Sequence, residues 1–221
     1  MSIQVIANNK TMVYGGTAPE LSARVVGDVG SFKPTYTLSR EPGDNVGEYV
    51  ITVTGDAVQG NFSVTYENGK FTITPRDVQV QALNATKTYG EDDPELKVRY
   101  VGLLEGESVS YTTLTRAPGD DVGEYTITVT GATEQGNYKV TFVGATFTIS
   151  PKTAKVIAEN KVKTYGDADP ELTVRTEGLV GDDKLIYTVE RAHGNDVGTY
   201  TITPSGDAVQ GNYKVVYETG N

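Results

Sequence analysis

The chain has 221 residues with no Cys, no Trp and a single His, and its formal net charge is −10. Without Cys it can form no disulfide, and it has no thiolate to serve as a metal ligand or a nucleophile. The 29 Asp and Glu against 19 Lys and Arg argue against nucleic acid or an anionic membrane surface as a partner, because both attract clustered positive charge. No apolar run approaches the roughly 18–20 residues of a spanning helix, so we expect no membrane insertion of this segment.

Short segments in which apolar and polar residues alternate follow one another along the chain, separated by Gly, Pro and Asn. Alternation at a period of two, rich in β-branched and aromatic residues, is typical of strands. No segment carries a helical stripe, and only residues 102–109 allow a short helical turn. In the first third of the chain the predicted strands lie near residues 3–7, 11–14, 20–26, 35–40, 48–54, 61–66 and 70–75.

One pattern of motifs occurs three times. A Tyr-Gly pair begins at positions 14, 89 and 165, so the period is 75 or 76 residues. This period exceeds the roughly 20–50 residues of most solenoid repeats and fits a small domain that closes its own core. We therefore predict an all-β protein of three tandem domains of the β-sandwich or β-grasp-like kind. These domains are repeat 1 (residues 1–75), repeat 2 (residues 76–151) and repeat 3 (residues 152–221).

The joints between repeats are very short. Pro75 and Pro151 each stand between the last strand of one repeat and the first strand of the next. Because Pro fixes φ and favours extended backbone, we predict stiff spacers and an elongated rod. Repeat 3 stops before a counterpart of the closing strand at residues 70–75, and we interpret the chain as an excised fragment of a longer array.

Few side chains offer chemistry. His193 is the only imidazole, and the other repeats have Pro42 and Pro118 at its position. The acidic clusters at residues 91–93 and 167–169 could offer oxygen ligands to Ca²⁺, but repeat 1 has no carboxylate there and surface charge explains them better. We predict no catalytic residue, no cofactor site and no metal site, and therefore no enzyme.

Recurring polar residues are interpreted as structural. We expect the recurring Arg to bond a carboxylate or a carbonyl across the sheets, and the Tyr of each Tyr-Gly pair to be a core anchor whose hydroxyl reaches backbone. The residues concerned are Arg40, Arg116 and Arg191, the recurring acids Glu20, Glu95 and Glu171, and the tyrosines Tyr14, Tyr89 and Tyr165.

The order of the motifs is specific. Each Tyr-Gly pair is followed by Pro-Glu-Leu, by the recurring Arg, by Val-Gly-x-Tyr (from Val46, Val122 and Val197) and by Gln-Gly-Asn with Phe or Tyr (from Gln59, Gln135 and Gln210). This order resembles the MBG repeat of the Tyr-Gly-x type. The resemblance covers nearly the whole chain and implies a β-rich module of bacterial cell-surface and secreted proteins, many of them adhesins. It brings no catalytic residues with it.

We therefore predict an extracellular structural protein, the stalk of a bacterial surface adhesin that spaces a ligand-binding tip. Its expected partners are neighbouring repeats of the parent protein and, through weak multivalent contacts, a host glycan or glycoprotein. The alternative is an accessory carbohydrate-binding module of an extracellular polysaccharide-processing enzyme. That alternative needs exposed aromatic platforms recurring on one face, and the lack of Trp counts against it.

Overall fold

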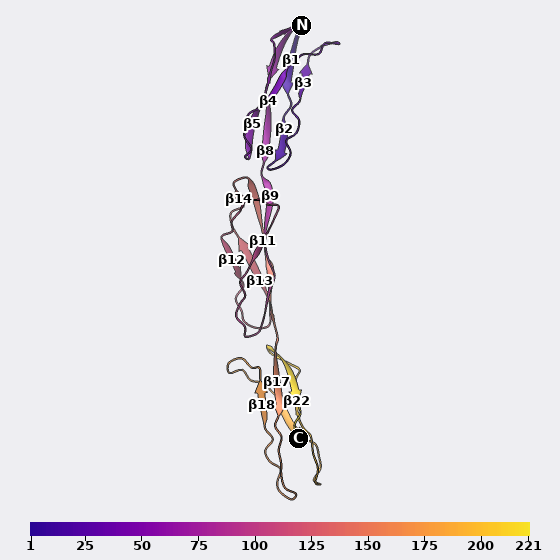
Figure 1. Ribbon diagram of the computed structural model, residues 1–221, viewed down its shortest axis with the longest axis vertical. Coiled ribbons are helices and arrows are strands. Elements are labelled where there is room, and N and C mark those ends of the chain that lie inside the picture. The colour runs from indigo at the N-terminus through magenta and orange to yellow at the C-terminus, as the bar shows by residue number, and fades with distance from the viewer. The chain divides into compact units, whose positions relative to one another are not determined.

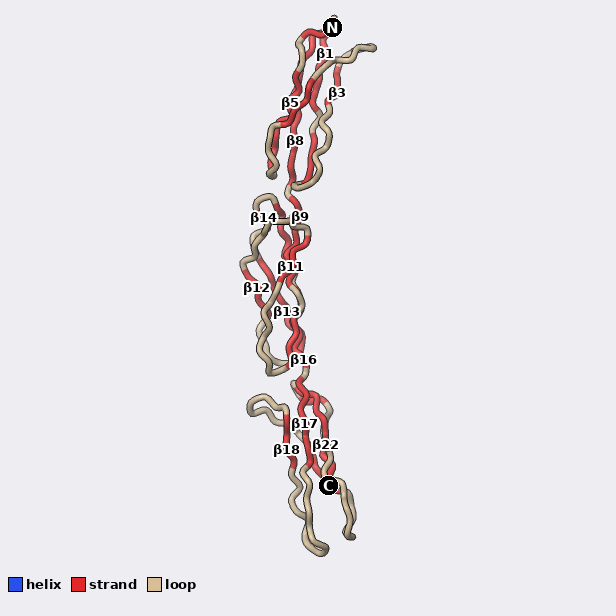
Figure 2. The backbone as a smooth tube through the Cα atoms, viewed as in Figure 1, coloured by secondary structure: helices blue, strands red, loops and turns tan.

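The structure is a computed structural model that describes residues 1–221. Strands joined by loops and turns make up the whole chain, as Figure 2 shows, and no helix is present. The prediction of an all-β protein is therefore confirmed. Residues 102–109, where the sequence allowed a helical turn, form a loop with a turn at Glu105 and Gly106. None of the chain forms a helix long and apolar enough to cross a membrane.

The fold divides into two compact units. Unit 1 holds Met1–Gln81, Val98–Thr113 and Val129–Val143, which is repeat 1 together with one part of repeat 2. Unit 2 holds Ala82–Lys97, Leu114–Thr128 and Gly144–Asn221, which is the other part of repeat 2 together with repeat 3. The division therefore passes through repeat 2, and the residues on either side of each Pro joint belong to the same unit.

Repeat 1 contains two four-stranded sheets. Each has one parallel pair, and its other pairs are antiparallel. In the first sheet the parallel pair is the two central strands, β1 and β7, and in the second it is the edge strand β2 with its neighbour β8 (Figure 1). The first sheet has the order β3 (Ala23–Val26), β1 (Ser2–Ala7), β7 (Phe62–Glu67) and β6 (Val58–Gln59). The second has the order β2 (Lys10–Val13), β8 (Gly69–Thr74), β5 (Gly47–Thr54) and β4 (Thr37–Arg40).

Two central strands pass from the first sheet into the second, and asparagines mark the crossing points. The chain goes from β1 to β2 across Asn8 and Asn9, and from β7 to β8 across Asn68. The Asn9 side chain accepts a bond from the N–H of Lys70 (2.8 Å), and the Asn68 side chain accepts one from the N–H of Val53 (3.2 Å). Side-chain oxygens thus satisfy backbone donors where the ladders change partners.

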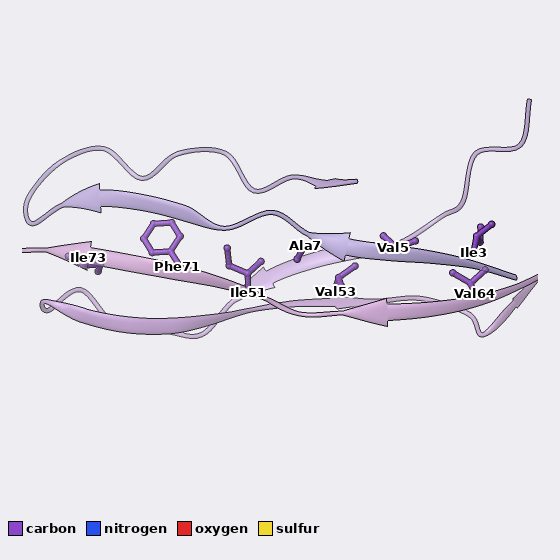
Figure 3. Packing of buried hydrophobic residues seen from close by; sticks show 8 residues of the cluster. All are labelled: Ile3, Val5, Ala7, Ile51, Val53, Val64, Phe71 and Ile73. Carbon is purple, nitrogen blue, oxygen red and sulfur yellow. The ribbon is translucent and has the colours of Figure 1, made fainter. Parts of the chain in front are cut away.

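The core of repeat 1 lies along these crossing strands and β5. Alternation places every second residue inward, and the inward side chains interdigitate between the strands in Figure 3. Burying each large aliphatic or aromatic side chain stabilises the fold by about 1.5–3 kcal/mol. The cluster consists of Ile3, Val5, Ala7, Ile51, Val53, Val64, Phe71 and Ile73.

Repeat 2 has the same two strand orders. Its parallel pairs are again the central pair of the first sheet, β9 with β15, and the edge pair of the second, β10 with β16. The first sheet consists of β11 (Val98–Val101), β9 (Arg76–Ala82), β15 (Tyr138–Val143) and β14 (Glu134–Gln135). The second consists of β10 (Ala85–Thr88), β16 (Ala145–Ser150), β13 (Gly123–Thr130) and β12 (Thr113–Arg116).

Repeat 3 keeps the first sheet and has only part of the second. In Figure 1, β17 and β22 lie side by side, and they form the parallel central pair. The first sheet consists of β18 (Val174–Glu177), β17 (Lys152–Ala158), β22 (Tyr213–Glu218) and β21 (Val209–Gln210). The second consists of β19 (Thr188–Arg191) and β20 (Ile202–Ser205).

Candidate functional site: the joints between repeats

The backbone runs from repeat to repeat almost without interruption. β8 ends at Thr74 and β9 begins at Arg76, so only Pro75 separates them. Backbone hydrogen bonds are made directly on both sides of Pro75. Before it, the Tyr14 N–H donates to the Thr74 carbonyl (2.9 Å), and after it, the Arg76 N–H donates to the Asn137 carbonyl (3.0 Å). The second joint, around Pro151, has the equivalent pair of bonds, from Tyr89 to Ser150 and from Lys152 to Asn212.

A carboxylate held by two tyrosines lies at the first joint. The Tyr14 hydroxyl of repeat 1 donates to Glu107 Oε1 (2.6 Å), and the Tyr138 hydroxyl of repeat 2 donates to Glu107 Oε2 (2.5 Å). The two rings meet edge to face with centroids 5.7 Å apart. Hydrogen bonds from the Tyr138 hydroxyl, which has the larger effect, and from the Tyr14 hydroxyl hold the pKa of Glu107 below its ordinary value. Burial and the carboxylate raise the pKa of Tyr138.

The second joint repeats this arrangement with a shorter acid. Asp183 Oδ2 of repeat 3 accepts from the hydroxyl of Tyr89 (3.0 Å) and from that of Tyr213 (2.6 Å). These rings also meet edge to face, 5.5 Å apart. Burial, followed by the bond to Asp183, raises the pKa of Tyr213 to about 12. We call the arrangement at both joints the Tyr–carboxylate–Tyr clamp.

An asparagine of each Gly-Asn-Tyr motif reaches back into the preceding repeat. Asn137 Oδ1 accepts from the N–H of Val46 (2.8 Å), and its Nδ2 donates to the side chain of Asn45 (3.0 Å). At the second joint Asn212 bonds Val122 (2.7 Å) and Asp121 (2.9 Å) in the same way. The Val-Gly-x-Tyr and Gly-Asn-Tyr motifs therefore meet at the joints.

At both joints the glycine of the Tyr-Gly pair makes room for an apolar side chain of the next repeat. Gly15 has φ +70°, and a Cβ there would lie 2.4 Å from Cδ1 of Leu104. Gly90 has φ +82°, and a Cβ there would lie 2.4 Å from Cγ2 of Val180. Both the backbone conformation and the close approach favour Gly at this position.

In repeat 3, the last repeat of the sequence, the same motif is exposed. Tyr165 and Gly166 are the Tyr-Gly pair of repeat 3, and the Tyr165 side chain is 72% exposed. Val197, the counterpart of Val46 and Val122, is 89% exposed. Tyr14 and Tyr89 do pack against core clusters, as expected. The expectation that the hydroxyl reaches backbone is wrong at both joints, where it bonds a carboxylate of the next repeat.

Sequence comparison of the repeats missed the acid of the clamp because it does not recur in all three. Its positions are equivalent, yet they hold Phe32 in repeat 1, Glu107 in repeat 2 and Asp183 in repeat 3. A change at two positions together could have revealed it. Repeat 1 has Phe at both positions, whereas the other repeats pair the acid with a Tyr: Phe62 stands where they have Tyr138 and Tyr213. Phe32 and Phe62 stack with centroids 4.6 Å apart.

The recurring Arg stacks on aromatic rings inside its own repeat. Arg116 lies over Phe147 (4.7 Å) and Tyr125 (5.4 Å), and it pairs with Asp93 at 2.5 Å. The bonds from Arg116 and Lys87 lower the pKa of Asp93 to about 2. Its carboxylate partner is therefore not the recurring Glu95, which sequence comparison had singled out.

The acidic clusters and His193 gain no catalytic geometry. Asp93 and its counterpart Asp169 are held by ion pairs, Asp169 with Lys163 (2.6 Å) and Arg191 (2.9 Å). Glu91 accepts from the N–H of Thr88. No group of three His or acidic side chains is arranged to hold a metal ion. His193 is exposed in the turn after β19.

A tyrosine recurs near the surface at equivalent positions of the three repeats. Tyr111 and Tyr187, at equivalent positions, are 40% and 37% exposed, and Tyr36 of repeat 1 is half-buried. In repeat 3 an open hollow beside Tyr187 is lined by the exposed side chains of Ile186 and Val209. The neighbouring recurring Gln is used structurally, since in each repeat its amide bonds both backbone groups of the residue before this Tyr.

These features define an all-β protein of tandem repeats whose recurring residues meet at the joints. The MBG domain (YGX type) family matches residues 3–72, 78–148 and 154–221, and the chain belongs to this family. Repeats of this family occur in surface and extracellular proteins, and the family is a non-catalytic one. No curated protein matches the chain.

Proposed function

We propose that this chain is a stalk segment of a bacterial surface adhesin, in which tandem repeats hold a ligand-binding part away from the cell. The observation that carries the proposal is the use of the recurring residues. The Tyr-Gly, Val-Gly-x-Tyr and Gly-Asn-Tyr motifs bond one repeat to the next at both joints. A protein that spaces two points needs such joints, whereas a catalyst or a receptor would need its recurring residues around a ligand.

Three kinds of contact at each joint support a fixed angle between the repeats that it connects. The clamp, the asparagine bonds and the apolar contact at Gly15 or Gly90 act at separate points around the Pro. A Pro joint restricts the backbone, and the side-chain contacts oppose the remaining rotation. An elongated rod stays a prediction of this proposal.

The absence of Cys makes a direct test of joint stiffness simple. Single cysteines at the exposed Thr11 and Lys139 would carry spin labels, one in each repeat, without background labelling. Double electron–electron resonance between the two labels should give one narrow distance distribution. Replacing Glu107 by Ala should broaden it, while replacing the exposed Asp92 by Ala should leave it unchanged. A broad distribution in the unaltered chain would overturn the stiff-joint account.

The second candidate is carbohydrate binding, favoured by Tyr111 and Tyr187 at equivalent exposed positions. Aromatic faces are a common platform for sugar rings because they combine apolar surface with a polar hydroxyl. A glycan array and a mucin pull-down test this candidate. The stalk proposal predicts that both are blank, and saturable binding of one sugar, lost in Tyr187→Ala, would support the alternative.

A further inference from the structure

The opening segment of repeat 1 (residues 2–13) and its closing segment (residues 63–74) run parallel and side by side through both sheets. β1 pairs with β7 in the first sheet, and β2 pairs with β8 in the second. In both sheets, every paired residue of the closing segment lies 61 positions after its partner. The register is therefore unchanged where the chain changes sheet, and the two segments form one ladder, which we call the terminal ladder.

A side chain continues the terminal ladder at the change of sheet. Asn9 Oδ1 accepts from the backbone N–H of Lys70 (2.8 Å), a residue that lies 61 positions later and so keeps the register. The backbone pairs resume at the next position, where Lys10 faces Phe71. The Asn9 side chain thus takes the place of a backbone acceptor, and the ladder has no break between the sheets.

Side chains also tie the two segments of repeat 1 together. Three side-chain hydrogen bonds cross from one segment to the other: Thr65 to the Ile3 carbonyl (3.3 Å), Thr74 to the Met12 carbonyl (3.3 Å) and Gln4 to Glu67 (3.0 Å). On the inward face the core side chains of both segments pack together, as Ile3 and Val64 do in Figure 3. Because this face excludes water, the ladder bonds beside it are stronger than bonds in solvent.

Repeat 2 has a terminal ladder of the same kind. β9 pairs with β15 and β10 pairs with β16, and the spacing between partners is 62 residues in both sheets. Here the Asn84 side chain accepts from the N–H of Thr146 (3.0 Å) at the change of sheet. The two repeats differ by one residue in spacing, yet each keeps its register constant, so the continuous ladder is a property of the fold.

The direction of the two segments decides how a repeat responds to tension along the chain. β1 opens repeat 1, and β8 closes it one residue before β9 begins. Because the segments are parallel, the start of β1 and the end of β8 lie at opposite ends of the terminal ladder. A pull between these two points slides one segment along the other and loads the ladder bonds together. In a hairpin both ends lie at the same end of the ladder, and the same pull opens the bonds one after another.

We propose that repeats 1 and 2 are load-bearing units whose terminal ladders resist tension applied along the chain. The proposal rests on the stalk function for the source of the tension, which a bound tip would transmit to the cell. Resistance to a pull is set by the rate of unfolding under load, so it depends on which bonds the pull loads as well as on equilibrium stability. The proposal therefore predicts a resistance that changes with the direction of the pull.

Two pairs of introduced cysteines test this direction in the full 221-residue chain, which has no Cys of its own. Ser2→Cys with Asp77→Cys attaches the handles of an optical trap at opposite ends of the terminal ladder, and we call this the shear pair. Ser2→Cys with Asn61→Cys attaches both at one end, because the Asn61 carbonyl accepts from the Met1 amine (3.1 Å), and we call this the peel pair. All three positions are exposed. The released length, roughly 3.3–3.6 Å for each residue between the handles, identifies repeat 1 as the part that unfolds.

The rupture force of the shear pair should be several-fold higher than that of the peel pair at the same pulling speed. Asn9→Ala should lower the force of the shear pair, because it removes a ladder bond. It should leave the force of the peel pair unchanged, because the bonds at the pulled end break first. Asn8→Ala is the matched control and should change neither force, since the Asn8 side chain bonds Ser22 (3.0 Å) outside the ladder.

Equal rupture forces for the shear pair and the peel pair would overturn the proposal. So would an Asn9→Ala variant that leaves the shear force unchanged or lowers both forces equally, since a general loss of stability does not depend on direction. Either result leaves the stalk proposal standing, because the spin-label distances across the joint test that proposal separately.

Discussion

Repeat 1 and the two repeats that follow it use the same two positions for different chemistry. Repeat 1 places Phe32 against Phe62 in a stacked pair, whereas repeat 2 places Glu107 against Tyr138. All three repeats nevertheless build the first sheet with one strand order. The tyrosine and the acid are therefore not needed to fold a repeat, and in repeats 2 and 3 they bind the tyrosine of the repeat before.

The strongest test of this comparison is to give repeat 2 the Phe pair that repeat 1 has at these two positions. The double variant Glu107→Phe with Tyr138→Phe should keep its β-sheet circular dichroism, because repeat 1 folds with this pair. It removes the acceptor of the Tyr14 hydroxyl, so the spin-label distance between Thr11 and Lys139 should become broad. A fold lost together with the joint would contradict the separation of the two roles.

Gly90 and Gly166 sharpen the comparison between a joined and a free Tyr-Gly motif. Both have positive φ, +82° and +92°, but only Gly90 faces a neighbouring side chain. Replacement by Ala should strain the backbone at both sites by about 1–2 kcal/mol, and overpacking against Val180 should add about 1–3 kcal/mol at Gly90 alone. Chemical denaturation measures the two losses, and equal losses would rule out the contact.

Asn137 and Asn61 make the equivalent comparison for the Gly-Asn motif. The Asn137 side chain bonds the preceding repeat, while its counterpart in repeat 1, Asn61, is exposed. Asn137→Ala should lower the free energy of unfolding by about 0.5–1.5 kcal/mol through lost hydrogen bonds. Asn61→Ala should change it by less than about 0.5 kcal/mol, as surface substitutions do. Indistinguishable effects would show that the bond at the joint does not form.

Alkaline pH should weaken the second joint. The pKa of Tyr213 is raised to about 12 from an ordinary value near 10, so its protonated form is favoured in the fold. Its contribution to stability is therefore complete below pH 10 and is lost as the pH rises toward 12. Ring-carbon NMR should follow this titration, and Asp183→Asn should lower the pKa of Tyr213. An unchanged pKa in that variant would contradict the clamp.

Much of the fold was predictable from residue order. Period-two alternation gave the strands, and the threefold motif gave the three repeats, because both patterns are local and recur. The parallel central pairs, such as β1 with β7, were not predictable, since strands about 60 residues apart meet there. The clamps were missed for a similar reason. Glu107 lies 93 residues after Tyr14, and its counterparts Phe32 and Asp183 hide it from a search for identical residues.

The most direct test of the joint is the titration of Glu107 by side-chain carbon NMR. The account predicts a pKa below that of an ordinary Glu, held down by hydroxyl bonds from Tyr138 and Tyr14. Tyr14→Phe, a change in the preceding repeat, should raise it, whereas Tyr165→Phe at the exposed counterpart should not. An ordinary pKa for Glu107 that Tyr14→Phe leaves unchanged would contradict the claim that recurring residues bind one repeat to the next.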